Sequence, residues 1–471
     1  MKRMIRSSRT ATIAVACIAT AMLMLDISVI NTALSNIASG LKTGLSGLQW
    51  VLDAYTLPLA ATVLTAGAVA DRLGRRRLFV IGMVVFTAAS AACGAAGQIG
   101  TLIASRAVQG MGAAVLFATA LALIAQVTPE PGQRAKALAA FGATIGAAFA
   151  IGPFVGGALT DAFGWRAIFL INVPIGVVAT LIAVRRVAEG RDPHARGVDW
   201  PGQVTLIGGL FLLILALLRG NGDGWGSPGI LAALAGAVVL LGAFVVVEWR
   251  SASPMLPLSL FRERRFTGAQ VAVFGIASTF FAIFLYITLY LQGVLGLPPI
   301  ETGLVYLPGT VLMFIVSGLT AQFASRVHPA KLAAVGLGLV AVGMASMLLT
   351  TTTSSWTAIL PGVLICCFGT GIFNPAASAL ALDALPAHQS GLASGASDTF
   401  RQTGVAIGIA ALGTLVPAGG AFGGNPAAYV SGFHHALIAG TALAAVCAVA
   451  TGVLLLGMRG WVGRLAPEAS S

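Results

Sequence analysis

The sequence is a series of long apolar runs, each about 20 residues long, separated by short polar segments. This is the length that an α-helix needs to cross the hydrocarbon core of a bilayer. Of the 471 residues, 57% are hydrophobic and only 9% are charged, whereas a soluble domain normally carries about a quarter charged residues. We therefore expect an all-α integral membrane protein.

Fourteen runs are long enough to span a membrane. They lie at about residues 12–34, 48–69, 78–97, 102–127, 135–159, 168–184, 201–218, 230–247, 269–291, 303–323, 332–349, 358–382, 391–416 and 436–456. The basic start of the chain, Met1–Arg9, has the charge of a signal peptide. The apolar run behind it is long enough to span, so we expect a retained first helix.

The two longest polar connections, 185–200 and 248–265, flank the seventh and eighth runs. This predicts a 6+2+6 arrangement. The first six-helix half covers residues 1–186, a central two-helix insert covers 187–265, and the second half covers 266–471.

The positive charges fall mostly on one side of the expected membrane. If the N-terminus is cytoplasmic, only Lys42, Arg166 and Arg219 of the 27 Lys and Arg residues lie in outer segments, while Arg106 and Arg401 lie within spans. Lys and Arg are enriched in cytoplasmic loops, so we expect a multi-pass protein of the cell membrane with both termini in the cytoplasm. The arginines form no single patch, so the net charge of +12 does not indicate nucleic-acid binding.

The sequence shows no sign of catalytic or cofactor chemistry. All five cysteines lie in apolar runs, which argues against a disulfide framework or a metal site. No lysine lies in a phosphate-binding glycine-rich motif. A membrane-embedded enzyme would need clustered His, Cys or carboxylate groups at one interface, and the sequence shows none. We therefore expect no enzyme, no cofactor and no metal.

The segment GAVADRLGRRRL, Gly67–Leu78, is a short basic turn between the second and third runs. Such positive charges could serve only to orient the protein in the membrane, but that role requires neither Asp71 nor Gly74. The segment resembles the loop between helices 2 and 3 of the major facilitator superfamily of secondary transporters. The resemblance implies a cytoplasmic gating loop made of Gly67, Asp71, Arg72, Gly74, Arg75 and Arg76.

The resemblance also implies that Asp71 meets the N-terminus of the helix that begins near Ser390 when the transporter faces outward, and a helix N-terminus attracts a carboxylate. We expect Arg75 or Arg76 to reach Glu130 separately.

In the first six runs, Asp26, Asp53 and Arg106 are charged residues that lie well inside spans. A charged side chain within the membrane costs free energy, so such a residue is by default a candidate for a functional site. The alternative is a structural role, in which an acid only forms an ion pair with an arginine. At about 1.5 Å per residue, all three fall at a similar level in the outer third of the membrane. We therefore expect Arg106 to lie between the two acids.

The surrounding segments, LDISVINTAL, LQWVLDAY and RAVQGMG, resemble motifs of the fourteen-span drug:proton antiporters of that superfamily. The resemblance implies that Asp26 and Asp53 handle protons or cationic substrate and that Arg106 couples them. Because Asp53 lies nearer the outer mouth, we expect its charge to favour cations.

Two further motifs lie in the fifth and thirteenth runs. Gly152, Pro153, Gly156 and Gly157 resemble the antiporter motif that marks exporters in the superfamily, although close helix packing would explain the glycines alone. In the thirteenth run, Asp398 and Arg401 are three residues apart, so we expect a structural ion pair on one helix face.

The resemblance covers nearly the whole chain. It implies the major facilitator fold, with two six-helix halves around a central cavity, and proton-driven export of small amphipathic or cationic compounds. The alternative within transport is export of a single antibiotic or metabolite. The expected partners are small-molecule substrates, protons and the lipid bilayer, and we expect a monomer.

Overall fold

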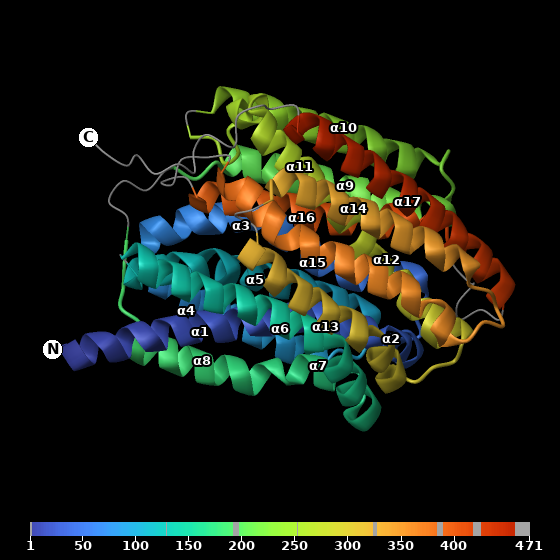
Figure 1. Ribbon diagram of the computed structural model, residues 1–471, viewed down its shortest axis with the longest axis horizontal. Helices are drawn as coiled ribbons and strands as arrows, with labels where there is room; N and C mark the ends of the chain where they lie inside the picture. The colour runs from blue at the N-terminus through green and yellow to red at the C-terminus, as the bar shows by residue number, and fades with distance from the viewer. Residues whose placement is uncertain are drawn as a thin grey trace.

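The computed structural model describes residues 2–128, 130–191, 197–251, 253–323, 327–383, 390–417 and 425–456. Within these ranges the chain is helical and contains no β-strand. Most helices run along the long axis of the molecule and form one bundle (Figure 1).

The first part of the chain forms nine helical elements. They are α1 (Lys2–Val29), the 3₁₀ turn η1 (Ile30–Ala33), α2 (Leu34–Leu41), α3 (Leu45–Leu73), α4 (Arg75–Gly94), α5 (Ile99–Val127), α6 (Pro131–Phe163), α7 (Ala167–Leu170) and α8 (Asn172–Arg186). Two long helices follow, α9 (Trp200–Asp223) and α10 (Pro228–Arg250).

The remaining part begins with the 3₁₀ turn η2 (Leu258–Arg262) and a long helix interrupted by two π-helical turns. Its segments are α11 (Arg264–Ile276), η3 (Ala277–Phe281), α12 (Ala282–Leu289) and η4 (Tyr290–Val294). Then come α13 (Pro299–Phe323), α14 (Pro329–Ser346), η5 (Met347–Leu349), η6 (Trp356–Ala358), α15 (Leu360–Asp383), α16 (Ser390–Gly413) and α17 (Pro426–Leu456).

In the part of the chain that the structure describes, thirteen helical segments are long and apolar enough to cross a membrane. Each of them matches one of the runs expected from the sequence. The remaining run, 391–416, is found as the 24-residue helix α16. It is not among the thirteen, because it carries Asp398, Arg401 and several small polar residues.

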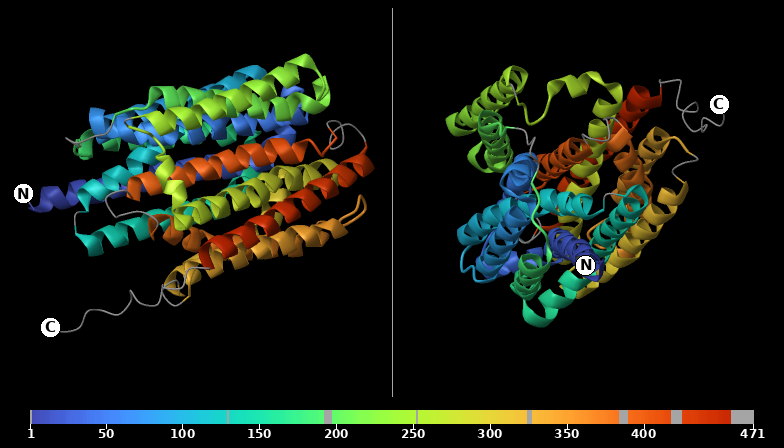
Figure 2. Two further views of the ribbon diagram at one scale, coloured as in Figure 1. Left: turned by 90° about the horizontal axis from the view of Figure 1, so that it is seen from above. Right: turned by 90° about the vertical axis from the view of Figure 1, so that its left-hand side faces the viewer.

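Seen along the bundle, α9 and α10 pack against each other at its edge (Figure 2). The first-half and second-half helices meet along two seams, α3 against α16 and α6 against α13. Helix α9 covers the first seam, since it packs on both α3 and α16.

Each end of α9 is bound to a different half. Near its start, Gln203 donates a hydrogen bond to the carbonyl of Ala61 in α3 at 2.8 Å and accepts one from Thr65. Near its far end, Asn221 donates to the carbonyl of Thr414, just past α16, at 2.6 Å. Helix α9 therefore connects α3 to the segment after α16 across the length of the bundle.

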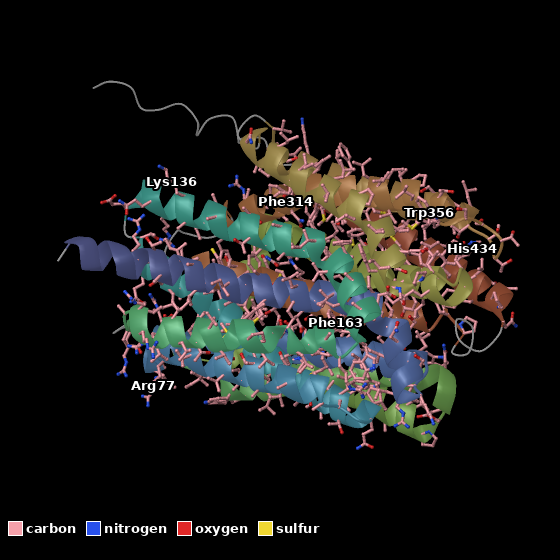
Figure 3. All side chains as sticks on the ribbon, turned by 90° about the horizontal axis from the view of Figure 1, so that it is seen from below. Arg77, Lys136, Phe163, Phe314, Trp356 and His434 are labelled. Carbon is pink, nitrogen blue, oxygen red and sulfur yellow. The ribbon has the colours of Figure 1, made fainter. Side chains whose placement is uncertain are left out.

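The two ends of the bundle differ in their charges. The end at which α3 turns into α4 is called the Gly74 end, and the end at which α6 turns into α7 is called the Trp165 end. Arg77 and Lys136 lie toward the first, whereas Trp356 and His434 lie toward the second (Figure 3).

Candidate functional site

A buried ion pair joins α1 to α5. The carboxylate of Asp26 contacts the guanidinium of Arg106, and each side chain is only 1% exposed. Arg106 also donates from Nε to the carbonyl of Val51 at 3.2 Å, and its Cζ lies 4.2 Å from the centre of the Tyr55 ring. Such a buried pair is tolerated only when its remaining hydrogen-bonding groups are satisfied.

Two amide side chains form hydrogen bonds with the remaining polar atoms of this ion pair. Gln109 accepts a hydrogen bond from Arg106 at 2.7 Å and donates to Asp26 and to Ser90, both at 2.8 Å. Asn172 of α8 donates to Asp26 at 3.1 Å. Neither amide was selected as a site residue from the sequence, although each is a polar side chain within an apolar run.

Asp53 lies elsewhere, and the expectation that Arg106 lies between two acids is wrong. Asp53 is fully buried, neither of its carboxyl oxygens has a hydrogen-bond partner within the described chain, and no ion pair joins it to Arg106. Val51 and Tyr55, each two residues away, face Arg106. Because each residue turns a helix by about 100°, Asp53 faces nearly the opposite way.

A central cavity lies between the two halves and is bordered by Arg106. The centres of water molecules can occupy about 160 Å³ of it, so it has room for several waters. One wall is apolar and aromatic, and it includes Phe117, Phe149, Phe281, Phe284 and Met313. Asp53 does not line the cavity, so the expectation that it contacts substrate here is not supported.

The expected ion pair between Asp398 and Arg401 does not form in this structure. Both side chains line the cavity instead. The spacing of three residues places them on one face of α16, as expected. That face borders the cavity, and the two side chains are too far apart there to form an ion pair.

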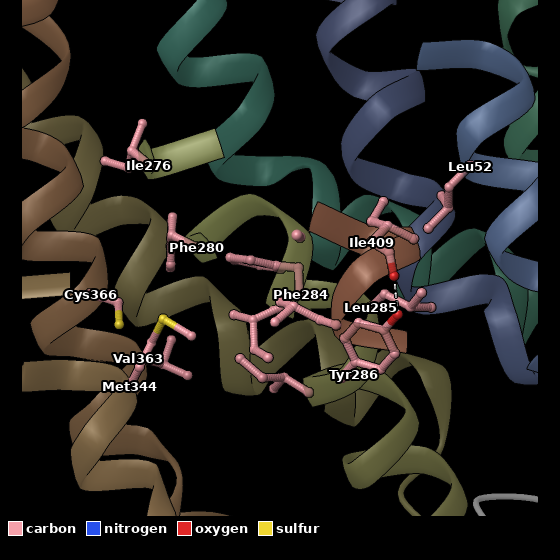
Figure 4. Packing of buried hydrophobic residues seen from close by; sticks show 14 of the residues in the cluster. Leu52, Ile276, Phe280, Phe284, Leu285, Tyr286, Met344, Val363, Cys366 and Ile409 are labelled. Carbon is pink, nitrogen blue, oxygen red and sulfur yellow. Dashed lines mark hydrogen bonds between the residues drawn. The ribbon is translucent and has the colours of Figure 1, made fainter. Parts of the chain in front are cut away.

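Uncharged hydrogen bonds hold the two halves together toward the Trp165 end. Gln49 of α3 donates to the hydroxyl of Tyr286 at 2.9 Å and to the carbonyl of Ile409 at 3.2 Å. Tyr286 also donates to that carbonyl (Figure 4). Nearby, Ser35 donates to Gln292 at 2.5 Å. Together they join α2 and α3 to α12, η4 and α16 toward this end.

The glycines of the antiporter-like motif lie where helices touch. A Cβ atom on Gly152 or Gly156 would overlap the end of α1, and one on Gly157 would overlap the backbone carbonyl of Pro299 in the second half. Pro153 lies inside α6 and its carbonyl packs against α13 at Gly303. The motif therefore forms part of the α6–α13 seam.

The loop at the Gly74 end is held by its own charges. Gly74 has a φ of +115°, which a residue with a side chain rarely adopts. Asp71 pairs with Arg75 at 2.8 Å, and the backbone N–H of Arg75 donates to the carbonyl of Gly190 at 2.9 Å.

Glu189 takes the position that the sequence analysis gives to Glu130. Its carboxylate accepts backbone hydrogen bonds from Arg76 and Arg77, each at 3.1 Å. The Arg76 side chain donates to the carbonyl of Val184. Two further loop residues, Gly67 and Arg72, make no such contact in the described ranges.

Two helical groups around a central cavity, with a buried ion pair at its wall, are the features of a membrane transporter. The sequence model of the Major Facilitator Superfamily matches residues 16–409, and the chain belongs to this family.

Several curated relatives are named for drug resistance or efflux. The multidrug resistance protein Stp of Mycobacterium tuberculosis is 35% identical over 400 residues, covering 84% of this chain and 74% of that protein. The puromycin resistance protein pur8 of Streptomyces alboniger is 35% identical over 454 residues, covering 94% and 88%. The drug efflux pump JefA of Mycobacterium tuberculosis is 33% identical, covering 84% and 78%.

A solved structure shows the same fold. The crystal structure of the peptide transporter POT in complex with sulfate superposes with a TM-score of 0.70 and covers 95% of this chain and 96% of that one. The sequence identity is 16%, so this similarity concerns the fold alone.

Proposed function

We propose that this protein exports small amphipathic compounds from the cytoplasm in exchange for protons. The observation that carries the proposal is the buried pair of Asp26 and Arg106 at the cavity wall. An ionisable pair inside a membrane span is expensive and marks proton or substrate pathways. The names of the relatives indicate drug-like compounds as the substrate class.

The network suggests how protons and substrate are coupled. An ionised Asp26 accepts hydrogen bonds from Arg106, Gln109 and Asn172. A proton on Asp26 removes the charge that holds the guanidinium and converts one acceptor into a donor. Arg106 is then free to turn toward the cavity. Proton uptake and substrate binding therefore act on the same group.

Alternating access would use the arrangement predicted from the sequence. We place the Gly74 end in the cytoplasm with both termini, and we count α16 as the thirteenth of fourteen spans. Residues 1–186 and 266–471 form the two halves that rock about the cavity, and residues 187–265 form the insert. The Gly74 loop gates the cytoplasmic side.

The test is transport in everted membrane vesicles with an imposed pH gradient and a fluorescent cationic dye. We expect Asp26→Asn to abolish gradient-driven uptake at normal expression. Asp223→Asn is the matched control, because it removes an exposed acid that pairs with Arg219 away from the cavity. Wild-type rates in Asp26→Asn would overturn the proposal.

A narrower function is export of one compound. The methylenomycin A resistance protein of Streptomyces coelicolor, 33% identical over 395 residues, is named for a single antibiotic. Growth protection by this protein against one compound, but not against chemically unrelated ones, would favour the narrower function.

A further inference from the structure

The cavity wall formed by α16 carries an acid and a base that make no ion pair and no hydrogen bond within the described residues. Asp398 is only 7% exposed, and its Oδ2 atom has no hydrogen-bond partner in the part of the chain described. Within the same ranges Arg401 forms neither an ion pair nor a hydrogen bond. Both line the cavity. Buried polar groups are normally satisfied, so the carboxyl of Asp398 points to a ligand, and the partly buried Arg401 lies on the same cavity wall.

A third unsatisfied group lies on the facing wall. The hydroxyl of Tyr55 in α3 is buried without a hydrogen-bond partner among the described residues, and Tyr55 also lines the cavity. Arg106, by contrast, is neutralised by Asp26. The cavity therefore offers one unpaired negative group, one unpaired positive group and one hydroxyl, with no net charge.

We propose that the cavity selects zwitterionic amphiphiles, which carry an ammonium group and a carboxylate close together on an apolar tail. The proposal rests on the proposed function and specifies its substrate class. Asp398 binds the ammonium group, and Arg401 binds the carboxylate through its planar pair of N–H donors. The tail packs on the aromatic wall that contains Phe149 and Phe284.

The spacing of the two side chains sets the shape of the ligand's head. Residues i and i+3 of a helix have Cβ atoms about 5–6 Å apart, so the two ligand charges belong on the same or neighbouring carbons, as in an amino acid. A simple cation gains Asp398 but is repelled by Arg401. A simple anion is attracted by Arg401 but repelled by Asp398. Only the zwitterion satisfies both groups.

Nε-dansyl-lysine provides a matched set of probes. The compound is zwitterionic, its methyl ester is cationic, its Nα-acetyl form is anionic, and the doubly blocked form is neutral. Dansyl fluorescence with purified protein in detergent gives four dissociation constants without a proton gradient. We expect the zwitterion to bind at least about tenfold more tightly than each of the others, since a hydrogen bond to a charged group contributes that much.

Two variants assign the charges. In Asp398→Asn, the zwitterion and the anionic probe should bind equally, because the ammonium group no longer contributes. In Arg401→Gln, the zwitterion and the cationic probe should bind equally. Asp223→Asn and Arg219→Gln are the controls, since they remove an exposed pair on α9 and should keep the wild-type order.

The wild-type measurement decides the proposal even if a variant fails to fold. Equal binding of all four probes, or tighter binding of the cationic probe than of the zwitterion, would overturn it. Zwitterion selectivity without gradient-driven transport would overturn the proposed function and leave this inference intact. Gradient-driven transport without charge selectivity would overturn this inference and leave the proposed function intact.

Discussion

Asp71 and Arg75 form an ion pair across the turn at Gly74, with 2.8 Å between Asp71 Oδ1 and Arg75 Nη2. Both side chains are partly exposed, and exposed pairs one helical turn apart typically contribute only about 0.3–0.5 kcal/mol. A pair this weak can exchange partners as the loop moves.

The first prediction is that Asp71 leaves Arg75 for the N-terminus of α16, near Ser390–Ser394, when the Gly74 end closes. Asp71→Asn should then slow transport more than it weakens substrate binding, because the closed end loses a helix-terminal contact of about 0.3–2 kcal/mol. Transport rates and probe affinities measured on the same variant check this. A defect confined to affinity would contradict it, as would an outward-facing structure with Asp71 far from Ser390–Ser394.

The second prediction concerns Glu189. Its carboxylate accepts the N–H groups of Arg76 and Arg77 in the first turn of α4, so Glu189→Ala should lower stability by about 0.5–2 kcal/mol, as loss of an N-terminal cap does. Thermal unfolding in detergent measures this. Glu130→Ala is the control, since Glu130 lies at the same end without contacting the loop, and it should leave the melting temperature unchanged. Equal effects would refute the assignment.

The third prediction concerns Gly157. A methyl group there would overlap the carbonyl of Pro299, so Gly157→Ala should push α6 and α13 apart and open the Trp165 end. Distances between spin labels on the two halves would lengthen at that end. Gly142→Ala lies in the same helix with open space around it and should leave the distances unchanged. Unchanged distances in Gly157→Ala would contradict the prediction that Gly157 sets the close approach of α6 and α13.

The fourth prediction concerns Asp53. Its carboxyl group is buried, with no hydrogen-bond donor in the described chain. An ionised carboxyl at this site would be an uncompensated buried charge, which the neutral isostere in Asp53→Asn avoids, so that variant should have a higher melting temperature. The same change should leave probe binding unaltered, because Asp53 does not line the cavity. Altered charge selectivity would restore the role expected from the sequence.

The fifth prediction concerns His328, whose ring accepts the N–H of Ala330 at the start of α14. Burial, together with Arg265 and Lys331, lowers the pKa of His328 below its ordinary value of 6.5. The unfolded chain therefore takes up a proton first as the pH falls through about 6.5, and stability decreases from there.

His328→Asn keeps a capping acceptor but does not titrate. We expect the melting temperature of the variant to fall less than that of the wild type between pH 8 and about pH 5.5. His435→Asn, an exposed histidine at the other end of the bundle, should follow the wild type. Parallel pH curves for all three proteins would contradict the prediction.

Helix positions and depths were predictable because the bilayer imposes them. A span needs about 20 apolar residues, and the fixed rise of a helix converts residue number into depth. That arithmetic placed Asp26 and Arg106 at one level, and their ion pair agrees with it.

Rotation about the helix axis was not predictable. These helices are apolar on most faces, so periodicity gives little indication of which face is buried. For this reason the sequence could not place Asp53 on the far side of α3 from Arg106, or direct Asp398 and Arg401 into the cavity. Glu189 belongs to no motif, and its role depends on how residues 187–191 return to α4.

Helix α9 is bound to the first half through Gln203 and to the second half through Asn221, at opposite ends of the bundle. A rigid helix anchored in this way keeps a fixed distance between its two attachment points. Rotation of one half against the other changes that distance, so the motion stops, or one hydrogen bond breaks, once the length of α9 is exceeded. Helix α9 would thus oppose the rotation proposed for transport until the exposed hydrogen bond at Asn221 breaks.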